Sequence, residues 1–321
     1  MKYAVVAGGA GFIGSHLCRR LLHEGMFVIC VDNLITGSEE NIEKLEKEQN
    51  FVFINHDIIS PLDNIFRQFE NIDYIFHLAS PASPNEKSDK SYIAHPIETL
   101  LVNSVGTHRL LNIAKEKNSR FLYASTSEVY GDPSVSPQPE TYYGNVNSVG
   151  IRSVYDEGKR FGEAMTMAYL RKFDVNARIV RIFNTYGENM REDDGRVVSN
   201  FIVQALQNKP ITIYGDGSQT RSFCYISDLI DGLFNFMTYD NVKGEVINLG
   251  NPTEYTVKQI ADKIKELVES SSEITYENLP NDDPKQRKPD ITKAKNLLDF
   301  SPKVEIDEGF KKTIEYFKKI I

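Results

Sequence analysis

The sequence predicts an α/β protein: a doubly wound, Rossmann-type parallel sheet with a smaller α/β substrate lobe toward the C-terminus. Two observations predict this fold. In the first half of the chain, short apolar and β-branched runs alternate with amphipathic helical stretches, which is the pattern of a parallel sheet covered on both faces. After about residue 182 the alternation weakens, and turn clusters at 187–195 and 215–218 separate shorter elements.

The predicted elements follow in chain order. The strands of the sheet are expected at residues 3–7, 27–32, 51–55, 74–78, 121–125 and 177–182. Helices are expected at 12–22, near 95–117 and near 155–172. A further apolar run near 246–249 could return to the sheet, so we expect the two lobes to exchange segments.

The domain boundaries follow from the same pattern. Residues 1–182, with a returning segment near 225–250, form the predicted dinucleotide-binding domain. Residues 183–224 and 251–321 form the predicted substrate lobe.

The composition limits the kinds of partner that the protein could bind. The 321 residues are 40% hydrophobic, which supplies a substantial core. A formal net charge of -8 without a basic block argues against nucleic acid and against an anionic membrane, since both reward clustered Lys and Arg. No apolar run reaches the roughly 18 residues of a membrane span, and we expect a cytoplasmic protein. Three scattered cysteines without a CxxC spacing predict neither disulfides nor a metal site.

A glycine pattern opens the first helix. Gly8, Gly11 and Gly14 stand directly after the first predicted strand, with Phe12 and Ile13 between the last two. Glycines there permit a tight turn and let backbone N–H groups approach a pyrophosphate. A turn that merely needs small residues is the alternative. The position between strand and helix favours a dinucleotide site.

An acidic residue ends the second predicted strand. Asp32 lies about 20 residues beyond the glycine pattern, where a carboxylate accepts hydrogen bonds from the adenosine ribose and repels a 2′-phosphate. The turn that follows, residues 33–37, contains no arginine to bind such a phosphate. A strand-end aspartate is otherwise often a cap, but in this context NAD is the predicted cofactor.

A tyrosine and a lysine form the predicted chemical centre. Tyr155 and Lys159 are four residues apart, so one helix face carries both side chains. An ammonium and an oxidised nicotinamide both stabilise a phenolate, which lets the tyrosine take a hydroxyl proton. Thr126 could hold the oxidised oxygen, whereas Glu128 could act as a base or orient water, or simply mark a helix start. His77, in an apolar strand, receives no role.

These motifs belong to a longer series. The chain resembles the extended short-chain dehydrogenase/reductase (NAD-dependent epimerase/dehydratase) superfamily from end to end, and within it the UDP-glucuronate decarboxylases, also called UDP-xylose synthases. The stretches that carry the resemblance are residues 8–14, 31–33, 55–57, 77–84, 125–133, 155–160, 181–187, 195–202, 217–221 and 283–290.

The resemblance implies a reaction cycle on bound NAD. Oxidation at sugar C4 gives a ketone beside the C5 carboxylate, carbon dioxide leaves, and C4 is reduced again, which turns UDP-glucuronate into UDP-xylose. It also implies a homodimer built through the helices near 95–117 and 155–172, and no metal.

The resemblance assigns residues to each part of this cycle. The expected catalytic residues are Thr126, Glu128, Tyr155, Lys159 and Arg287. The expected cofactor-binding residues are Gly8, Gly11, Phe12, Ile13, Gly14, Asp32, Asn33, Thr36, Gly37, Asp57, Ile58, Leu78, Ser80, Tyr155 and Lys159. The expected contacts to the UDP-sugar are Ser83, Asn184, Arg196, Asn200, Tyr214, Gln219, Arg221 and Arg287.

One residue separates the decarboxylases from a related reaction. Sugar nucleotide 4,6-dehydratases of the superfamily carry Asp-Glu after the threonine, because loss of water from C6 needs a proton donor. Ser127 stands there in this chain, and loss of carbon dioxide needs no such acid. A 4,6-dehydratase or epimerase remains the alternative. A silent NAD-binding module is a second one, although the tyrosine, lysine and threonine are all present.

The chain also departs from the decarboxylases. Residues 85–92 form an insertion in a loop expected to border the sugar. Leu101 and Val102 replace Lys-Thr, and Arg109 replaces an asparagine. The absence of the lysine means either that the group on C5 is not a carboxylate or that Arg109 or Arg287 takes the place of the lysine.

Overall fold

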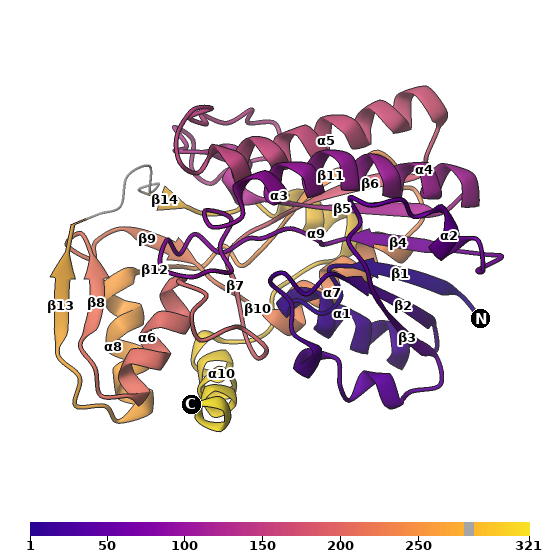
Figure 1. Ribbon diagram of the computed structural model, residues 1–321. Helices are drawn as coiled ribbons and strands as arrows, with labels where there is room; N and C mark the ends of the chain where they lie inside the picture. Colours follow the sequence, from indigo (N-terminus) through magenta and orange to yellow (C-terminus); the bar gives the residue numbers. More distant parts are fainter. Residues whose placement is uncertain (279–285) are drawn as a thin grey trace.

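The computed structural model describes residues 1–278 and 286–321 (Figure 1). Residues 283–285 of the predicted motif at 283–290 therefore lie outside the described residues. The main sheet has seven strands, all parallel, in the order β11-β6-β5-β4-β1-β2-β3. This order confirms the predicted doubly wound, Rossmann-type sheet.

The strands of this sheet lie close to the predicted ranges. They are β1 Tyr3–Ala7, β2 Phe27–Asp32, β3 Phe51–Asn55, β4 Tyr74–His77, β5 Arg120–Thr126, β6 Ala177–Ile182 and β11 Val246–Leu249. β4 ends one residue earlier than predicted, and β5 extends the prediction by one residue at each end, so that Thr126 is its last residue. β11 does return to the sheet, where it pairs with β6.

Helices cover both faces of the sheet, which is why its strands are almost entirely apolar. Alternate residues of β1 belong to different clusters: Ala4 and Val6 face one side, and Val5 and Ala7 the other. On the first side lie α1 Phe12–His23, α7 Ile226–Thr238 and α9 Thr292–Leu298. On the second lie α2 Asp63–Phe66, α4 Thr107–Lys117 and α5 Ser153–Phe173, and α3 Pro96–Leu101 packs beside α5. Short 3₁₀ helices occupy Glu39–Asn41, Leu45–Lys47 and Ser127–Tyr130.

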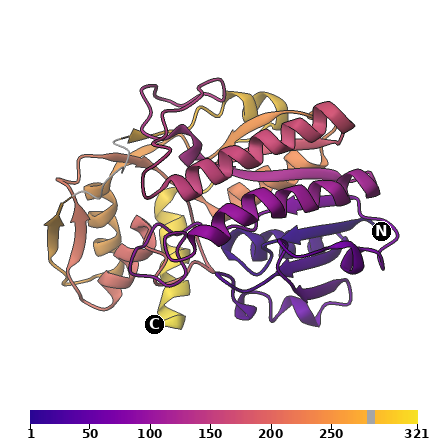
Figure 2. The same cartoon turned by 45° about the horizontal axis from the view of Figure 1, so that its top comes forward.

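The helix predicted near 95–117 contains an irregular turn. A π-helical turn, Val102–Gly106, joins α3 to α4, and both helices run beside α5 along one side of the molecule (Figure 2). Asn103 in this turn is fully buried, and its side-chain amide donates to the Ser80 hydroxyl and to the Thr99 carbonyl. Such turns often occur at functional sites.

The smaller lobe lies beyond the carboxyl ends of the sheet strands (Figure 1). Its elements are β7 Thr185–Tyr186, α6 Val197–Leu206, β8 Ile211–Tyr214, β9 Thr220–Ser222, β10 Cys224–Tyr225, β12 Glu254–Thr256, α8 Val257–Val268, β13 Ile274–Glu277, β14 Gln286–Arg287 and α10 Ile306–Ile320. β9 lies between β12 and β14, whereas β8 pairs with β13 and β7 with β10. One apolar cluster runs from the sheet into this lobe. The exact domain boundaries stay a prediction.

The described residues contain neither a membrane-spanning helix nor a cluster of metal-binding side chains. No helix in 1–278 or 286–321 is long and apolar enough to cross a membrane. In the same ranges, no group of three or more His, Cys, Asp or Glu side chains could hold a metal ion. Cys18, Cys30 and Cys224 are buried and unbridged.

Candidate active site

The predicted cofactor residues gather at one edge of the sheet. They lie in the loops that follow β1, β2, β3 and β4, together with the start of α1 and one face of α5. Because these strands are parallel, their carboxyl ends share an edge, which is where open α/β sheets bind ligands. The structure therefore brings together the residues that the sequence predicted for the dinucleotide.

Two glycines make the first of these loops possible. Gly8 has φ +82°, and a Cβ there would lie 2.6 Å from the backbone nitrogen of Ala79. A Cβ at Gly14 would lie 2.0 Å from the carbonyl oxygen of Gly8. No other residue type fits either place. Gly11 caps α1 without a side chain, so the first amides of the helix are left for a ligand such as a pyrophosphate.

Asp32 is fixed by backbone amides at the end of β2. One carboxylate oxygen accepts from the Ala10 amide at 3.0 Å and the other from the Leu34 amide at 2.9 Å. Burial raises the pKa of Asp32 while these two hydrogen bonds oppose the shift. A Cβ at Gly37 would lie 2.9 Å from the carboxylate, so this turn passes directly over it. Thr36 lies in the same turn.

The loops after β3 and β4 complete this edge. The Asn33 side chain donates to the Asp57 carboxylate at 2.9 Å, which joins the loops after β2 and β3. Ile58 is buried against the π-helical turn. The Leu78 amide donates to the Ala7 carbonyl at 2.8 Å, which extends the pairing of β4 with β1 by one residue. Ser80 receives its hydrogen bond from Asn103 at 2.9 Å. A glycine cradle, an amide-held aspartate and this polar rim fit a dinucleotide.

Tyr155 and Lys159 meet at the start of α5. Both side chains are buried, and the Lys159 ammonium lies 5.8 Å from the centre of the Tyr155 ring. Lys159 also donates to the Ala124 carbonyl of β5 at 2.8 Å, which ties α5 to the sheet. Thr126 ends the same strand, and a hydrogen bond between its side chain and Tyr155 acts to lower the pKa of the tyrosine. The predicted trio is therefore assembled at one point.

The acidities at this point differ from the sequence-based expectation. Burial raises the pKa of Tyr155 to about 12, although Arg196 and Thr126 act in the opposite direction. Burial lowers the pKa of Lys159 to about 7, while Glu163 opposes the shift. The expected lowering of the Tyr155 pKa depends on Lys159 and the oxidised nicotinamide together. In the protein without the cofactor, desolvation dominates the pKa of both side chains.

Glu128 lies between two arginines. Its carboxylate accepts both arms of the Arg287 guanidinium, at 2.6 and 2.8 Å, and an arm of Arg152 at 2.6 Å. Although burial acts to raise it, these cations hold the pKa of Glu128 at about 2. A carboxylate so stabilised is a weak base, so the geometry favours a positioning role over proton abstraction.

Asp156 faces this cluster from α5. It is buried, and one of its carboxylate oxygens has no hydrogen-bond partner among the described residues. Burial and the nearby Glu128 raise its pKa to about 7, against Arg152 and Arg287. Asp156 therefore holds a proton over a much wider pH range than an ordinary aspartate.

The predicted sugar contacts fall into two groups. Near the chemical centre, Ser83 donates to the Asp194 carbonyl, and Arg196 donates to the Ala82 carbonyl at 2.8 Å and to the Asp194 carboxylate at 3.0 Å. The side-chain amide of Asn200 donates a hydrogen bond to the Gly195 carbonyl at 3.2 Å.

The second group lines the substrate lobe. Arg221 of β9 and Arg287 of β14 stand side by side in register. Asn184 accepts from the Cys224 amide through its carbonyl. Tyr214, at the end of β8, is 39% exposed and accepts from Gln219 through its carbonyl, so these two lie at the outer part of the lobe.

Sequence reasoning missed three residues of this site: Tyr92, Arg152 and Asp156. Arg152 stands three residues before Tyr155, a spacing that places both on one side of a helix start and could have pointed to it. Asp156 follows the tyrosine directly and had no such signal. The ring of Tyr92 stacks on Tyr155 with the ring centres 5.0 Å apart. Tyr92 comes from the insertion at 85–92, whose loop path no spacing predicts.

The suggested compensation by Arg109 was wrong. Its guanidinium donates to the Ile59 carbonyl at 3.0 Å, behind the loop that follows β3. Leu101 is 36% exposed on α3. Neither residue joins the cluster around Tyr155 and Glu128.

The chain is similar in sequence to known proteins. The profile of the NAD dependent epimerase/dehydratase family matches residues 4–250. UDP-glucuronic acid decarboxylase 1 of Xenopus tropicalis is 50% identical over 318 residues, 99% of this chain and 72% of that protein. UDP-glucuronic acid decarboxylase 2 of Arabidopsis thaliana is 49% identical over 98% of this chain and 68% of its own.

Solved structures of related enzymes have a similar fold. UDP-glucuronic acid 4-epimerase from Bacillus cereus, in complex with UDP-glucuronic acid and NAD, has a TM-score of 0.87 at 30% identity and covers 99% of this chain and 100% of its own. UDP-glucose 4-epimerase from Thermotoga maritima, with UDP-glucose, has a TM-score of 0.89 at 30% identity and covers 99% of each chain.

Fold and site together define a Rossmann-type enzyme with a nicotinamide dinucleotide and a buried tyrosine-lysine pair. The chain belongs to the NAD dependent epimerase/dehydratase family, and its cofactor is NAD.

Proposed function

We propose that this enzyme decarboxylates UDP-glucuronate to UDP-xylose, with oxidation and re-reduction of sugar C4 on one bound NAD. The observation that carries the proposal is identity of about one half, over almost the whole chain, to proteins named UDP-glucuronic acid decarboxylases. Ser127 in place of an acid after Thr126 supports a reaction without loss of water.

The glycine loop and its neighbours would hold the cofactor. The pyrophosphate would lie on the start of α1 at Gly11, Phe12, Ile13 and Gly14, and the adenosine ribose on Asp32. Asn33, Thr36, Gly37, Asp57, Ile58, Leu78 and Ser80 would form the rest of the wall. When bound, NAD supplies the reversible oxidation of the sugar at C4.

Tyr155 would exchange the proton of the C4 hydroxyl. In the protein without the cofactor, burial raises the pKa of Tyr155 and so disfavours its phenolate. The positive charges of Lys159 and of the oxidised nicotinamide would have to lower this pKa at the moment of reaction. Lys159 would do so from its anchor on the Ala124 carbonyl, and Thr126 would hold the C4 oxygen. Tyr155 returns the proton when C4 is reduced again.

Decarboxylation follows from the chemistry of the intermediate. The 4-ketone makes the C5 carboxylate a β-keto acid, which loses carbon dioxide as the ketone draws the electron pair, and a proton then adds at C5. Glu128, held by Arg287 and Arg152, would fix the sugar in the orientation this requires. Arg196, Arg221, Ser83, Asn184, Asn200, Tyr214 and Gln219 are the proposed contacts to the UDP-sugar.

The test is direct. The purified protein, incubated with UDP-glucuronate, should release carbon dioxide and UDP-xylose in equal amounts. Formation of the C4 epimer without carbon dioxide, or turnover only with a neutral hexose nucleotide, would replace the proposal by an epimerase or a dehydratase.

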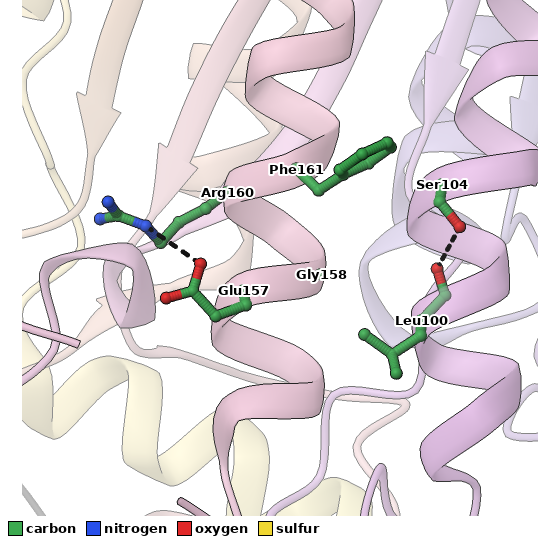
Figure 3. A pocket seen from close by; sticks show the side chains of 6 residues that line it. All are labelled: Leu100, Ser104, Glu157, Gly158, Arg160 and Phe161. Carbon is green, nitrogen blue, oxygen red and sulfur yellow. Dashed lines mark hydrogen bonds and ion pairs between the residues drawn. The ribbon is translucent and has the colours of Figure 1, made fainter. Parts of the chain in front are cut away.

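We also propose a homodimer through α3 and α5. These adjacent helices expose the apolar side chains of Ile97, Leu100, Leu101 and Phe161, at 36% to 60% exposure. A shallow hollow of about 450 Å³ lies between the helices, with Leu100, Ser104 and Phe161 on its walls (Figure 3). Apolar side chains gathered on one helical face are typical of an interface. The division into an NAD lobe and a substrate lobe at the predicted boundaries, and the cytoplasmic location, stay predictions.

A further inference from the structure

The proposed reaction needs an acid besides Tyr155. Loss of carbon dioxide leaves an electron pair shared between C5 and the C4 oxygen, and C5 must gain a proton before C4 is reduced again. Tyr155 holds the proton that returns to the C4 oxygen, and Lys159 is anchored on the Ala124 carbonyl at 2.8 Å. The proton for C5 therefore requires a further donor among the buried side chains of the site.

Two neighbouring groups are unsuited to this task. The Glu128 carboxylate accepts hydrogen bonds from Arg287 and Arg152, and these cations hold the pKa of Glu128 at about 2 against the effect of burial. Glu128 is therefore ionised and has no proton to give. Tyr92 stacks on Tyr155, but burial raises the pKa of its phenol, which makes it a poor acid near neutral pH.

Asp156 has the position that the task requires. It follows Tyr155 directly on α5, is only 7% exposed, and acts electrostatically on both Tyr155 and Tyr92. Its Oδ1 atom has no hydrogen-bond partner among residues 1–278 and 286–321. Because native proteins satisfy nearly all buried polar atoms, an unpartnered carboxyl oxygen beside the catalytic tyrosine indicates a ligand as its partner.

The surroundings of Asp156 keep a proton on it. Burial and the negative charge of Glu128 raise its pKa, and Glu157 adds to the rise. Arg152 and Arg287 oppose this rise, but both guanidinium groups are bound to Glu128. The resulting pKa of about 7 leaves Asp156 protonated near neutral pH and still acidic enough for general acid catalysis.

We propose that Asp156 is the general acid that gives its proton to C5 of the sugar after carbon dioxide has left. This inference rests on the proposed function. The O–H bond of Asp156 breaks as the C5–H bond forms, the electron pair of the enolate makes the new bond, and the C4 ketone is restored. Asp156 is left as a carboxylate facing Arg152 and Arg287, and it regains a proton from water when the product leaves.

A single turnover separates the loss of carbon dioxide from the protonation of C5. Asp156→Asn keeps the size of the side chain but has no acidic proton. With NAD and UDP-glucuronate at pH 7, it should release carbon dioxide within about threefold of the normal rate. UDP-xylose should form about 10²-fold more slowly, since a positioned general acid contributes at least that much, and the absorbance of the reduced cofactor should persist during the delay.

The matched control is Asp174→Asn. Asp174 follows the last residue of the same helix, and its exposed side chain pairs with Lys243. This substitution removes the same acidic group outside the site, so it should change neither rate.

The pH dependence of the delay gives a second readout that needs no substitution. In the unsubstituted enzyme, the delay between carbon dioxide and UDP-xylose should lengthen as the pH rises through about 7, because Asp156 loses its proton. The Asp156→Asn enzyme retains Lys159, which also titrates near pH 7, and should lack this dependence. A delay in the unsubstituted enzyme that is independent of pH overturns the inference, even if the variant does not fold.

The outcomes for the variant are distinct. Equal slowing of both products in Asp156→Asn would give Asp156 a merely structural role, and prompt formation of UDP-xylose would place the donor elsewhere; each overturns the inference. The affinity for NAD reports whether the variant is folded. If the unsubstituted enzyme releases carbon dioxide from UDP-glucuronate, either result leaves the proposed function standing. If it releases none, the proposed function and the inference both fail.

Discussion

At the scale of single residues, the sequence predicted what depends on spacing along the chain. Gly8, Gly14 and Asp32 lie where the motif predicted, and Tyr155 meets Lys159 because four residues make one helical turn. Acidities could not be predicted in this way, because burial and partners distant in sequence set them. The raised pKa of Tyr155 is the clearest case.

Tyr155→Phe should lower kcat by about 10²–10⁴-fold, because a positioned general acid-base group usually contributes a rate acceleration of that size. The ring and its stacking on Tyr92 are retained, so the affinity for NAD should change by less than about twofold. Steady-state kinetics and calorimetric titration of NAD check the two parts. Undiminished turnover would show that another group exchanges the C4 proton.

Arg287→Lys tests the two hydrogen bonds that the Arg287 guanidinium donates to the Glu128 carboxylate. A lysine keeps the charge but cannot make both hydrogen bonds, so kcat/KM should fall by about 10–100-fold with NAD affinity unchanged. Arg109→Lys, whose single bond to Ile59 lies outside the site, is the control and should stay within about twofold. Equal effects of the two substitutions would contradict a special role for Arg287.

At the scale of elements, α5 organises the site. Its first two turns carry Tyr155, Asp156 and Lys159, and the next turn carries Glu163, which binds Arg181 at 2.8 Å. The existence of this helix could be predicted from its apolar periodicity. The π-helical turn between α3 and α4 could not, because it depends on the buried Asn103 finding partners in Tyr123 and Ser80.

Asp156 makes stability depend on pH. Its folded pKa of about 7 lies above the ordinary value for aspartate, so its contribution is fully present below pH of about 4 and is lost as the pH rises through about 7. Asp156→Asn mimics the protonated form and should remove this loss. From pH 5 to pH 8, the free energy of unfolding of the variant should rise relative to the unsubstituted protein by about 1–3 kcal/mol, because about two of the three pH units between the ordinary and the raised pKa lie in this range, at about 1.4 kcal/mol each.

Denaturant unfolding at the two pH values measures this difference. Lys159 also titrates near pH 7, but it is present in both proteins and largely cancels from the comparison. A constant difference between the two proteins across this range would mean that Asp156 is already ionised at pH 5 in the folded state.

At the scale of the whole molecule, the parallel sheet could be predicted with its strand positions, and so could the return of β11 beside β6. The substrate lobe could not be predicted in detail. Its sheets are made of two- to four-residue strands, such as β9 and β14, that pair across long stretches of chain. Such pairings depend on tertiary packing more than on local pattern.

The proposed dimer belongs to this scale. Phe161→Glu would place a charge in the centre of the exposed apolar face of α3 and α5, and the protein should elute from gel filtration at the monomer mass. Tyr239→Glu changes a side chain of similar exposure, 42%, at the end of α7 and should leave the dimer intact. If the unsubstituted protein already elutes as a monomer, the proposed interface is wrong.

The central claim, a C4 oxidation that is reversed within one catalytic cycle, is tested most directly with UDP-glucuronate carrying deuterium at C4. The hydrogen removed from C4 should stay in the closed site and return to the same carbon, so UDP-xylose should retain the deuterium, and in heavy water a solvent deuteron should enter at C5. Loss of the C4 label, or release of a 4-keto pentose with one NADH formed for each carbon dioxide, would contradict the account.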